Sequence, residues 1–201
     1  MTTFVPDSAA ANNIIYCTEA PSPIGPLLLT SDGNALTGLY MTEHRHGPRA
    51  GEPLSTWGIQ ATPGRSQAWQ RDDHTPPFHL AKEQLAAYFQ GQLIRFDLPL
   101  SLHGTPFQQQ VWQALQEIPY GVTISYGDLA RRVGNPNGSR AVGLANGHNP
   151  VSIIVPCHRV IGSNGQLTGY GGGLPRKAAL LDFEFTVLVS GPRPFLAMSP
   201  S

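Results

Sequence analysis

The stretch at residues 153–159, IIVPCHR, constrains the fold of this chain more than any other. Its three β-branched residues predict a short buried strand. Pro156 cannot extend a central strand, so the chain should leave the sheet there. Cys157 is therefore expected at the mouth of a rigid element, directly before His158. Sulfur attacks as a thiolate, which a nearby base or positive charge favours. On these residues alone, a catalytic cysteine and a buried structural cysteine both stay open.

Length and charge give the next bounds. The chain has 201 residues and a formal charge of zero, enough for one large domain or two small ones. The charge is uneven, because residues 1–119 carry six Lys or Arg and ten Asp or Glu, whereas residues 120–180 carry six Lys or Arg and one acidic residue. A basic half around a candidate nucleophile suits a DNA partner. A surface can also be basic without one.

Cysteine and histidine usage argues against a metal centre. Cys17 and Cys157 are too few for a disulfide framework or a cysteine metal cluster, and they predict a reducing, cytoplasmic compartment. His44 and His46 form an H-x-H pair without a third ligand nearby, so we expect two exposed loop histidines and no metal. The first residues lack the features of a signal peptide. No stretch has the roughly 20 apolar residues of a membrane-spanning helix.

The N-terminal half predicts a small antiparallel sheet with one helix. Residues 1–12 are expected to form a disordered tail, and residues 43–67 lack periodicity and predict a long loop. Strands are expected at residues 14–19, 27–30 and 35–41, and a helix from residue 75 to about residue 90. We assign residues 13–98 to an N-terminal α/β domain and residues 99–104 to a linker.

The C-terminal half predicts a mainly helical domain at residues 105–189, followed by a tail at 190–201. Thr105 opens a capping box with proline at the first helical position, and Ser125 opens a second one. Helices are expected at residues 105–117, 125–133, 136–147 and 174–185. A short helix, a tight turn and another short helix are typical of a helix-turn-helix. The predicted fold class is α+β, with the helix-turn-helix and Cys157 in the second domain.

The predicted helix at residues 136–147 is unusually rich in small residues, among them Gly138, Ala141 and Gly143. Glycine inside a helix costs about 1 kcal/mol relative to alanine, so another interaction should offset that cost. One interpretation is close approach of the helix to the minor groove of a DNA duplex. The other is tight packing against a neighbouring helix. Composition does not decide between them.

The motif around Cys157 resembles the active-site signature of the O6-alkylguanine-DNA alkyltransferases, the methylated-DNA–protein-cysteine methyltransferases. The resemblance rests on Pro156-Cys157-His158-Arg159 with Val160 after it, on Asn149-Pro150 upstream, and on Gly169, Tyr170 and three further glycines downstream. It covers residues 105 to about 184 closely and the earlier part loosely. It implies direct-reversal DNA repair, in which a flipped base enters a pocket and a soft nucleophile attacks its alkyl carbon.

The resemblance also implies residue roles. Cys157 is the nucleophile and alkyl acceptor, His158 the base acting through a water, and Glu184 the carboxylate that orients His158, in the manner of a hydrolytic triad. Without the resemblance, Glu184 would be interpreted as an exposed helical charge. Asn149 shapes the active-site turn, and Tyr126 assists flipping and donates a proton. The implied DNA-binding residues are Arg140, which fills the gap left by the flipped base, with Tyr126, Ser125, Ala141, Gly143 and Asn135.

The alkyl pocket implied by the resemblance is formed by Val155, Pro156, Tyr170, Gly171 and Gly172. Many relatives have a serine at the position of Gly171, which puts a side-chain contact to the base in doubt. The implied partner is double-stranded DNA containing O6-alkylguanine, acted on by a monomer without a cofactor or metal. The product is a thioether, so each protein molecule acts once. Activity on O4-alkylthymine and cooperative binding stay open.

Three alternatives remain at this point. An alkyltransferase-like protein would bind the lesion without transfer, but such proteins lack the reactive cysteine that Cys157 supplies. A cysteine hydrolase would leave the helix-turn-helix unexplained. A transcription regulator would need major-groove readers along its recognition helix, where this chain offers chiefly Arg140 and Asn146.

Overall fold

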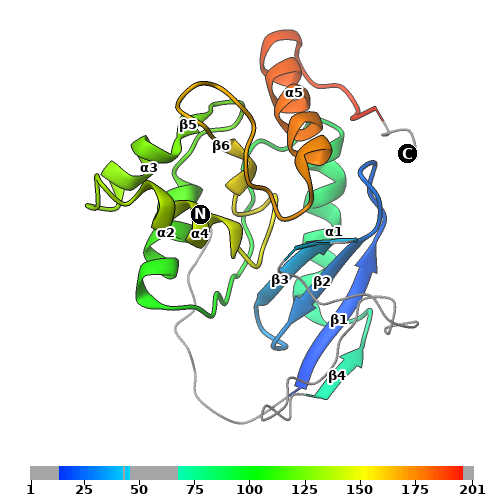
Figure 1. Ribbon diagram of the computed structural model, residues 1–201. Coiled ribbons are helices and arrows are strands. Elements are labelled where there is room, and N and C mark those ends of the chain that lie inside the picture. Colours follow the sequence, from blue (N-terminus) through cyan, green and yellow to red (C-terminus); the bar gives the residue numbers. More distant parts are fainter. Residues whose placement is uncertain (1–13, 43, 46–67, 197–201) are drawn as a thin grey trace.

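The computed structural model describes residues 14–42, 44–45 and 68–196. The predicted tail at residues 1–12 and nearly all of the predicted loop at residues 43–67 lie outside these ranges. The architecture is α+β, as predicted, with a sheet and one helix in the N-terminal domain and a mainly helical C-terminal domain (Figure 1). Within the described residues, no helix is both long and apolar enough to cross a membrane.

The N-terminal sheet has four strands in the order β3-β2-β1-β4. Its bounds are β1 (Ile14–Ala20), β2 (Leu27–Ser31), β3 (Leu36–Met41) and β4 (Ala68–Arg71). The first three strands form the predicted antiparallel meander. β4 was not predicted, and it pairs with β1 in parallel. Helix α1 (Pro76–Phe89) packs against the sheet through apolar side chains such as Phe78 and Leu85. Cys17 is fully buried in β1, as expected for an inert thiol.

The C-terminal domain contains the predicted helix-turn-helix. Its elements are α2 (Pro106–Gln116), β5 (Ile124–Ser125), α3 (Tyr126–Arg132), α4 (Ser139–Gly147), the 3-10 helix η1 (Cys157–Arg159), β6 (Val160–Ile161) and α5 (Leu174–Ser190). Both predicted capping boxes are present, Thr105 with Gln108 at α2 and Ser125 with Asp128 at α3. These caps satisfy backbone N–H groups that no residue inside the helix can reach, and so fix where α2 and α3 begin.

Three predicted elements differ from the structure. Residues 153–155 form a buried turn rather than a strand, with Ile153 at a φ of 71°. Helix α4 begins at Ser139, not at residue 136, because Gly138 N–H bonds to the Asn135 carbonyl in a turn. Helix α5 continues to Ser190, five residues past the predicted end, so the predicted start of the tail at residue 190 is one residue too early.

The two domains meet along the outer edge of β3. The backbone of Leu36 pairs with Pro99 and Ser101, and the backbone of Leu39 pairs with Pro150 and Ser152. Each pairing is a single parallel bridge. The predicted linker and the segment before Cys157 therefore both extend the N-terminal sheet. As a result, the segment that leads to Cys157 lies against β3.

Candidate active site

Cys157 begins a 3-10 helix immediately after the buried turn. Its side chain is almost completely buried, with 4% of the residue exposed. Asn149 holds the preceding turn, because its side-chain amide donates to the Val155 carbonyl at 2.8 Å and its Oδ1 accepts from Val151 N–H at 3.0 Å. These bonds satisfy backbone groups that a strand would otherwise pair. Asn149 therefore supplies two of the hydrogen bonds that hold this turn.

The carboxylate of Glu184 is fully buried and accepts five hydrogen bonds. His158 Nε2 donates to Oε1 at 2.9 Å, and Arg159 donates to both oxygens, also at 2.9 Å. Tyr88 Oη donates to Oε1 at 2.8 Å, and Gly121 N–H donates to Oε2 at 3.0 Å. Burial alone would raise the pKa of Glu184, but His158 and Arg159 outweigh it and hold that pKa well below its usual value. Glu184 is therefore ionised, and the interpretation as an exposed charge is wrong.

His158 is held as a neutral base. Burial lowers the pKa of His158, against the opposing attraction of Glu184. Arg159 already balances the charge of Glu184, so a second cation would leave a net buried charge. Because Nε2–H donates to Glu184, the proton of the neutral ring is on Nε2. His158 Nδ1 has no hydrogen-bond partner among the described residues, and its lone pair can accept a proton.

Two members of this network had no role in the sequence analysis. Arg159 belongs to the motif, but its bonds to Glu184 and to the Ile118 carbonyl could not be read from the chain. Tyr88 comes from α1 of the N-terminal domain. Its contact with Glu184 joins residues that are 96 positions apart in sequence. The sequence signal for Arg159 was its place in the motif, whereas Tyr88 looked like an ordinary apolar residue of α1.

The thiol of Cys157 is protonated at rest. Burial raises its pKa, against hydrogen bonds from the side chains of Asn149 and Ser152 and the positive charge of Lys177. The Lys177 side chain is fully buried, and its Nζ donates to the carbonyls of Val160 and Thr168, both at 2.6 Å. Burial lowers the pKa of Lys177 to about 8. From sequence, Lys177 was only one of the six basic residues at positions 120–180. Its position seven residues before Glu184, on the same face of α5, was the available signal.

Tyr126 and the segment at residues 168–173 form another side of the site. Tyr126 Oη donates to the carbonyls of Thr168 and Gly169, at 3.1 and 3.3 Å. Burial raises the pKa of Tyr126, and the nearby Cys157 raises it further, so the hydroxyl keeps its proton at neutral pH. The ring also lies 5.8 Å from Lys177 Nζ. Tyr126 is thus a proton-carrying group close to the sulfur.

The remaining pocket residues are closely packed. Val155, Pro156 and Tyr170 are buried. A Cβ on Gly171 would lie 2.3 Å from the His44 ring, and one on Gly172 would lie 2.1 Å from Met41 Sδ. The absence of side chains at Gly171 and Gly172 therefore allows these residues to pack against His44 and Met41. The expectation of an exposed His44 is wrong, because only 7% of it is exposed. His46 lies outside the described residues.

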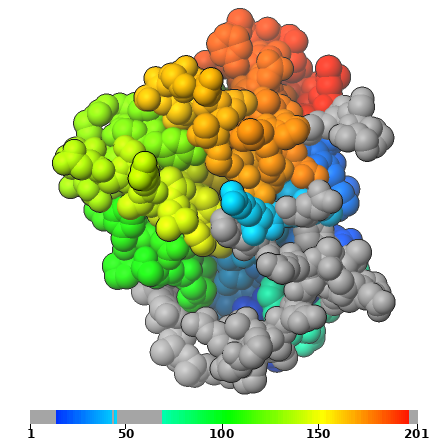
Figure 2. Space-filling view, in the orientation of Figure 1, coloured from blue at the N-terminus to red at the C-terminus, as the bar shows by residue number. Residues whose placement is uncertain are grey.

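The face of α3 and α4 opposite the core is exposed. Arg140, Ala141 and Asn135 are on its surface, and Figure 2 shows this yellow-green region forming one side of the molecule. A Cβ on Gly143 would lie 3.6 Å from the Tyr126 ring, an ordinary contact, so internal packing does not require glycine there. Ser125 uses its hydroxyl in the cap of α3. Asn146 is buried, which removes one of the two major-groove readers of the regulator hypothesis.

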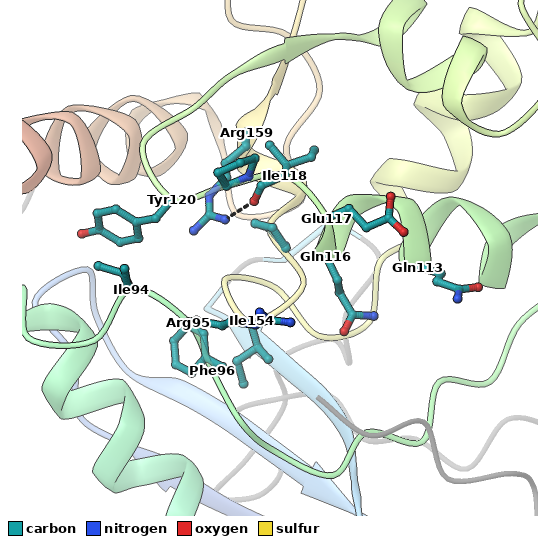
Figure 3. Close-up of a pocket in the computed structure, with 12 residues that line it drawn as sticks. Ile94, Arg95, Phe96, Gln113, Gln116, Glu117, Ile118, Tyr120, Ile154 and Arg159 are labelled. Carbon is teal, nitrogen blue, oxygen red and sulfur yellow. Dashed lines mark hydrogen bonds between the residues drawn. The ribbon is translucent and has the colours of Figure 1, made fainter. Parts of the chain in front are cut away.

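A cavity of about 550 Å³ lies beside the motif (Figure 3). It lies between residues 94–96, the end of α2 and Arg159, whose guanidinium donates to the Ile118 carbonyl. Pro156 also lines it, but Cys157 does not. The cavity is therefore not the route to the sulfur. Among the described residues, no three His, Cys, Asp or Glu side chains are grouped as metal ligands would be.

Two family models match this chain. The 6-O-methylguanine DNA methyltransferase, ribonuclease-like domain, matches residues 15–102. The 6-O-methylguanine DNA methyltransferase, DNA binding domain, matches residues 106–186. The chain belongs to the 6-O-methylguanine DNA methyltransferase family. The family assignment made from the Cys157 motif is thereby confirmed.

Individual relatives of this chain support the same family assignment. The methylated-DNA–protein-cysteine methyltransferase of Mycobacterium tuberculosis H37Rv is 51% identical over 171 residues, which is 85% of this chain and 93% of the relative. The constitutive protein of the same name from Bacillus subtilis is 44% identical over 172 residues, covering 84% and 94%. A crystal structure of Mycobacterium tuberculosis OGT in complex with DNA superposes with a TM-score of 0.70 at 48% identity, covering 86% of this chain and 93% of that one.

Proposed function

We propose that this chain is a methylated-DNA–protein-cysteine methyltransferase that repairs O6-alkylguanine in DNA by moving the alkyl group to Cys157. The observation that carries the proposal is the Glu184–His158 pair, which leaves His158 Nδ1 without a partner among the described residues, on the residue that follows the buried, protonated Cys157. A base in that position can create the thiolate on demand. The relatives' names and the DNA-bound neighbour support the same assignment.

The proposed reaction needs only the protein, the alkylated DNA and water. His158 Nδ1 takes the Cys157 proton, through a water molecule as the resemblance implies. The thiolate attacks the saturated alkyl carbon, so the S–C bond forms as the C–O6 bond breaks. The electron pair of that bond stays with the guanine, which takes up one proton. Tyr126 is the proposed donor, because its raised pKa keeps the hydroxyl protonated.

The burial of Cys157 supports base flipping. With 4% of Cys157 exposed, a base that stays stacked in a duplex cannot reach the sulfur. The nucleotide must leave the stack and enter the protein. Arg140 is exposed on α4 and is the proposed residue that fills the gap. A thioether is stable to the acid and base side chains described around Cys157, so we propose one turnover per protein molecule.

The test is intact-protein mass spectrometry after mixing with a short duplex containing one O6-methylguanine, followed by peptide mapping. We expect a gain of one methyl group on Cys157 that saturates at one per protein. The matched control is Cys157→Ala, which should retain the modified duplex and gain no mass. An unmodified wild-type protein that still retains the modified duplex would overturn transfer in favour of lesion binding. Release of free product with continuing turnover would indicate a hydrolase.

A further inference from the structure

Tyr88 brings the N-terminal domain into contact with the Glu184 carboxylate. It lies near the C-terminal end of α1, and its hydroxyl donates to Glu184 Oε1 at 2.8 Å. Both side chains are fully buried, and α1 and α5 belong to different domains (Figure 1). Burial and the Glu184 charge raise the pKa of Tyr88 well above its usual value. The hydroxyl therefore keeps its proton and acts on Glu184 only as a donor.

The oxygen that Tyr88 contacts is crowded with donors. Glu184 Oε1 accepts from Tyr88, from His158 Nε2 at 2.9 Å and from Arg159 Nη2 at 2.9 Å. Oε2 accepts from Arg159 Nε and from Gly121 N–H. A carboxylate has about four lone-pair positions, and here five donors share them. Tyr88 and His158 therefore compete for the electron density of one oxygen.

This competition limits how strongly Glu184 attracts the His158 proton. A hydrogen bond to a carboxylate stabilises its ionised form and makes it less basic. Without the Tyr88 hydroxyl, Glu184 would be more basic, and its bond to His158 would favour the imidazolium form more strongly. With the hydroxyl present, the imidazole is held closer to its neutral form, in which Nδ1 can still take a proton.

We propose that Tyr88 is a positioning residue for methyl transfer, which donates to Glu184 Oε1 and thereby limits the basicity that Glu184 gives to His158. The inference rests on the proposed function, because His158 is the base of that reaction. It gives the N-terminal domain a part in the chemistry of the site. The other titratable and charged side chains around this pair are Cys157 and Arg159 of η1, Lys177 of α5, Tyr120 and Tyr170.

The variant that tests the inference is Tyr88→Phe, which removes the hydroxyl and keeps the ring. The four remaining hydrogen bonds still fill the acceptor positions of Glu184. No buried acceptor is left unpaired, so the variant should fold. Tyr120→Phe is the matched control. The Tyr120 ring lies 6.0 Å from the Tyr88 ring, and its buried hydroxyl has no hydrogen-bond partner among the described residues.

Two measurements follow the protonation of His158. An NMR titration of the histidine rings follows it directly, with the signal assigned among the seven histidines by its loss in His158→Gln. The acid limb of the pH profile for the second-order rate of methyl transfer, from an O6-methylguanine duplex, follows it through the reaction. We expect Tyr88→Phe to move both midpoints to higher pH by up to about one pH unit, the order of one hydrogen bond to a charged group. Tyr120→Phe should leave both midpoints unchanged.

Equal midpoints in Tyr88→Phe and the wild type would overturn the inference. Equal shifts in the Tyr88 and Tyr120 variants would also overturn it, because loss of any buried hydroxyl would then have the same effect. A shift of the ring titration without a shift of the rate profile would mean that Tyr88 acts on a histidine that does not limit transfer, and the inference would again be wrong. The proposed function fails separately, if the wild type takes no methyl group from the duplex. The ring titration would then still decide whether Tyr88 acts on His158.

Discussion

The two sides of Cys157 are held by different kinds of interaction. On the carboxylate side, Glu184 accepts five hydrogen bonds, and Arg159 compensates its charge. On the loop side, Gly171 packs on His44 from another domain, at a distance that no side chain on residue 171 would allow. The first side depends on charge balance and the second on close packing. A substitution should therefore fail for a different physical reason on each side.

The largest effect is expected on the carboxylate side. Glu184→Gln replaces one acceptor oxygen by a donor amide, which must face donors from Arg159, His158 or Gly121. It also leaves the Arg159 charge buried without its partner. We expect a loss of about 3–5 kcal/mol in the free energy of unfolding, measured by denaturant titration, together with slower transfer. Glu83→Gln makes the same change on the exposed face of α1 and should be nearly neutral. Equal stability of the two variants would contradict the charge-balance account.

The loop side should respond to size and not to charge. Gly171→Ala places a Cβ 2.3 Å from the His44 ring, and overpacking of this kind costs about 1–3 kcal/mol in unfolding free energy. The clash disappears if His44 is cut back, so His44→Ala combined with Gly171→Ala should recover part of the loss. Gly127→Ala is the matched control, since its Cβ would make only ordinary contacts. Absence of rescue in the double variant would separate Gly171 from His44.

The same contrast explains how much the sequence could predict. The capping boxes at Thr105 and Ser125 are local, because each joins residues only three positions apart in sequence. Both were predicted. The motif around Cys157 likewise contains its own base. The turn at residues 153–155 was predicted as a strand, because a fully buried apolar run has no periodicity that separates a strand from a turn. The decisive contact is the side chain of Asn149, whose bonds replace strand pairing.

Contacts between segments that are far apart in sequence could not be predicted from local sequence patterns. β4 lies beside β1 but follows a long aperiodic stretch, so nothing near it in sequence marked it. His44 was expected to be exposed because it lies in a loop with glycine and proline. It is buried, and its neighbours include Gly171 and Ser152 of the C-terminal domain. Lysine is rarely buried, so nothing in the charge count of residues 120–180 marked Lys177 as a buried residue. Its two carbonyl acceptors come from segments that precede α5.

A substitution in a third region, the exposed face of α4, should not affect either side of Cys157. Arg140 is exposed there, and it is the proposed residue that fills the gap left by the flipped base. A cation bound to the duplex also displaces counterions, so its removal should lower the salt-dependence slope of DNA binding by up to about 1. We therefore expect Arg140→Ala to weaken binding and slow repair of duplex DNA, while iodoacetamide alkylation of Cys157 stays at the wild-type rate. Binding isotherms at several salt concentrations measure the slope. An unchanged repair rate would remove Arg140 from the mechanism.

A pH-dependent effect is expected at Lys177, which lies near the sulfur. Its pKa of about 8 in the folded protein lies below the value of 10.5 expected for an unfolded chain. Between these values the unfolded chain binds more protons than the folded one, so stability rises with pH. The penalty for burying the charge is fully present below pH 8 and is relieved as the pH approaches 10.5. A Lys177→Met variant has no such titration. The lysine protein should therefore gain stability relative to the methionine variant between pH 8 and pH 10, measured in a Cys157→Ala background so that the thiol does not titrate. A constant difference over this range would mean that Lys177 keeps its proton, and that the sulfur faces a permanent charge.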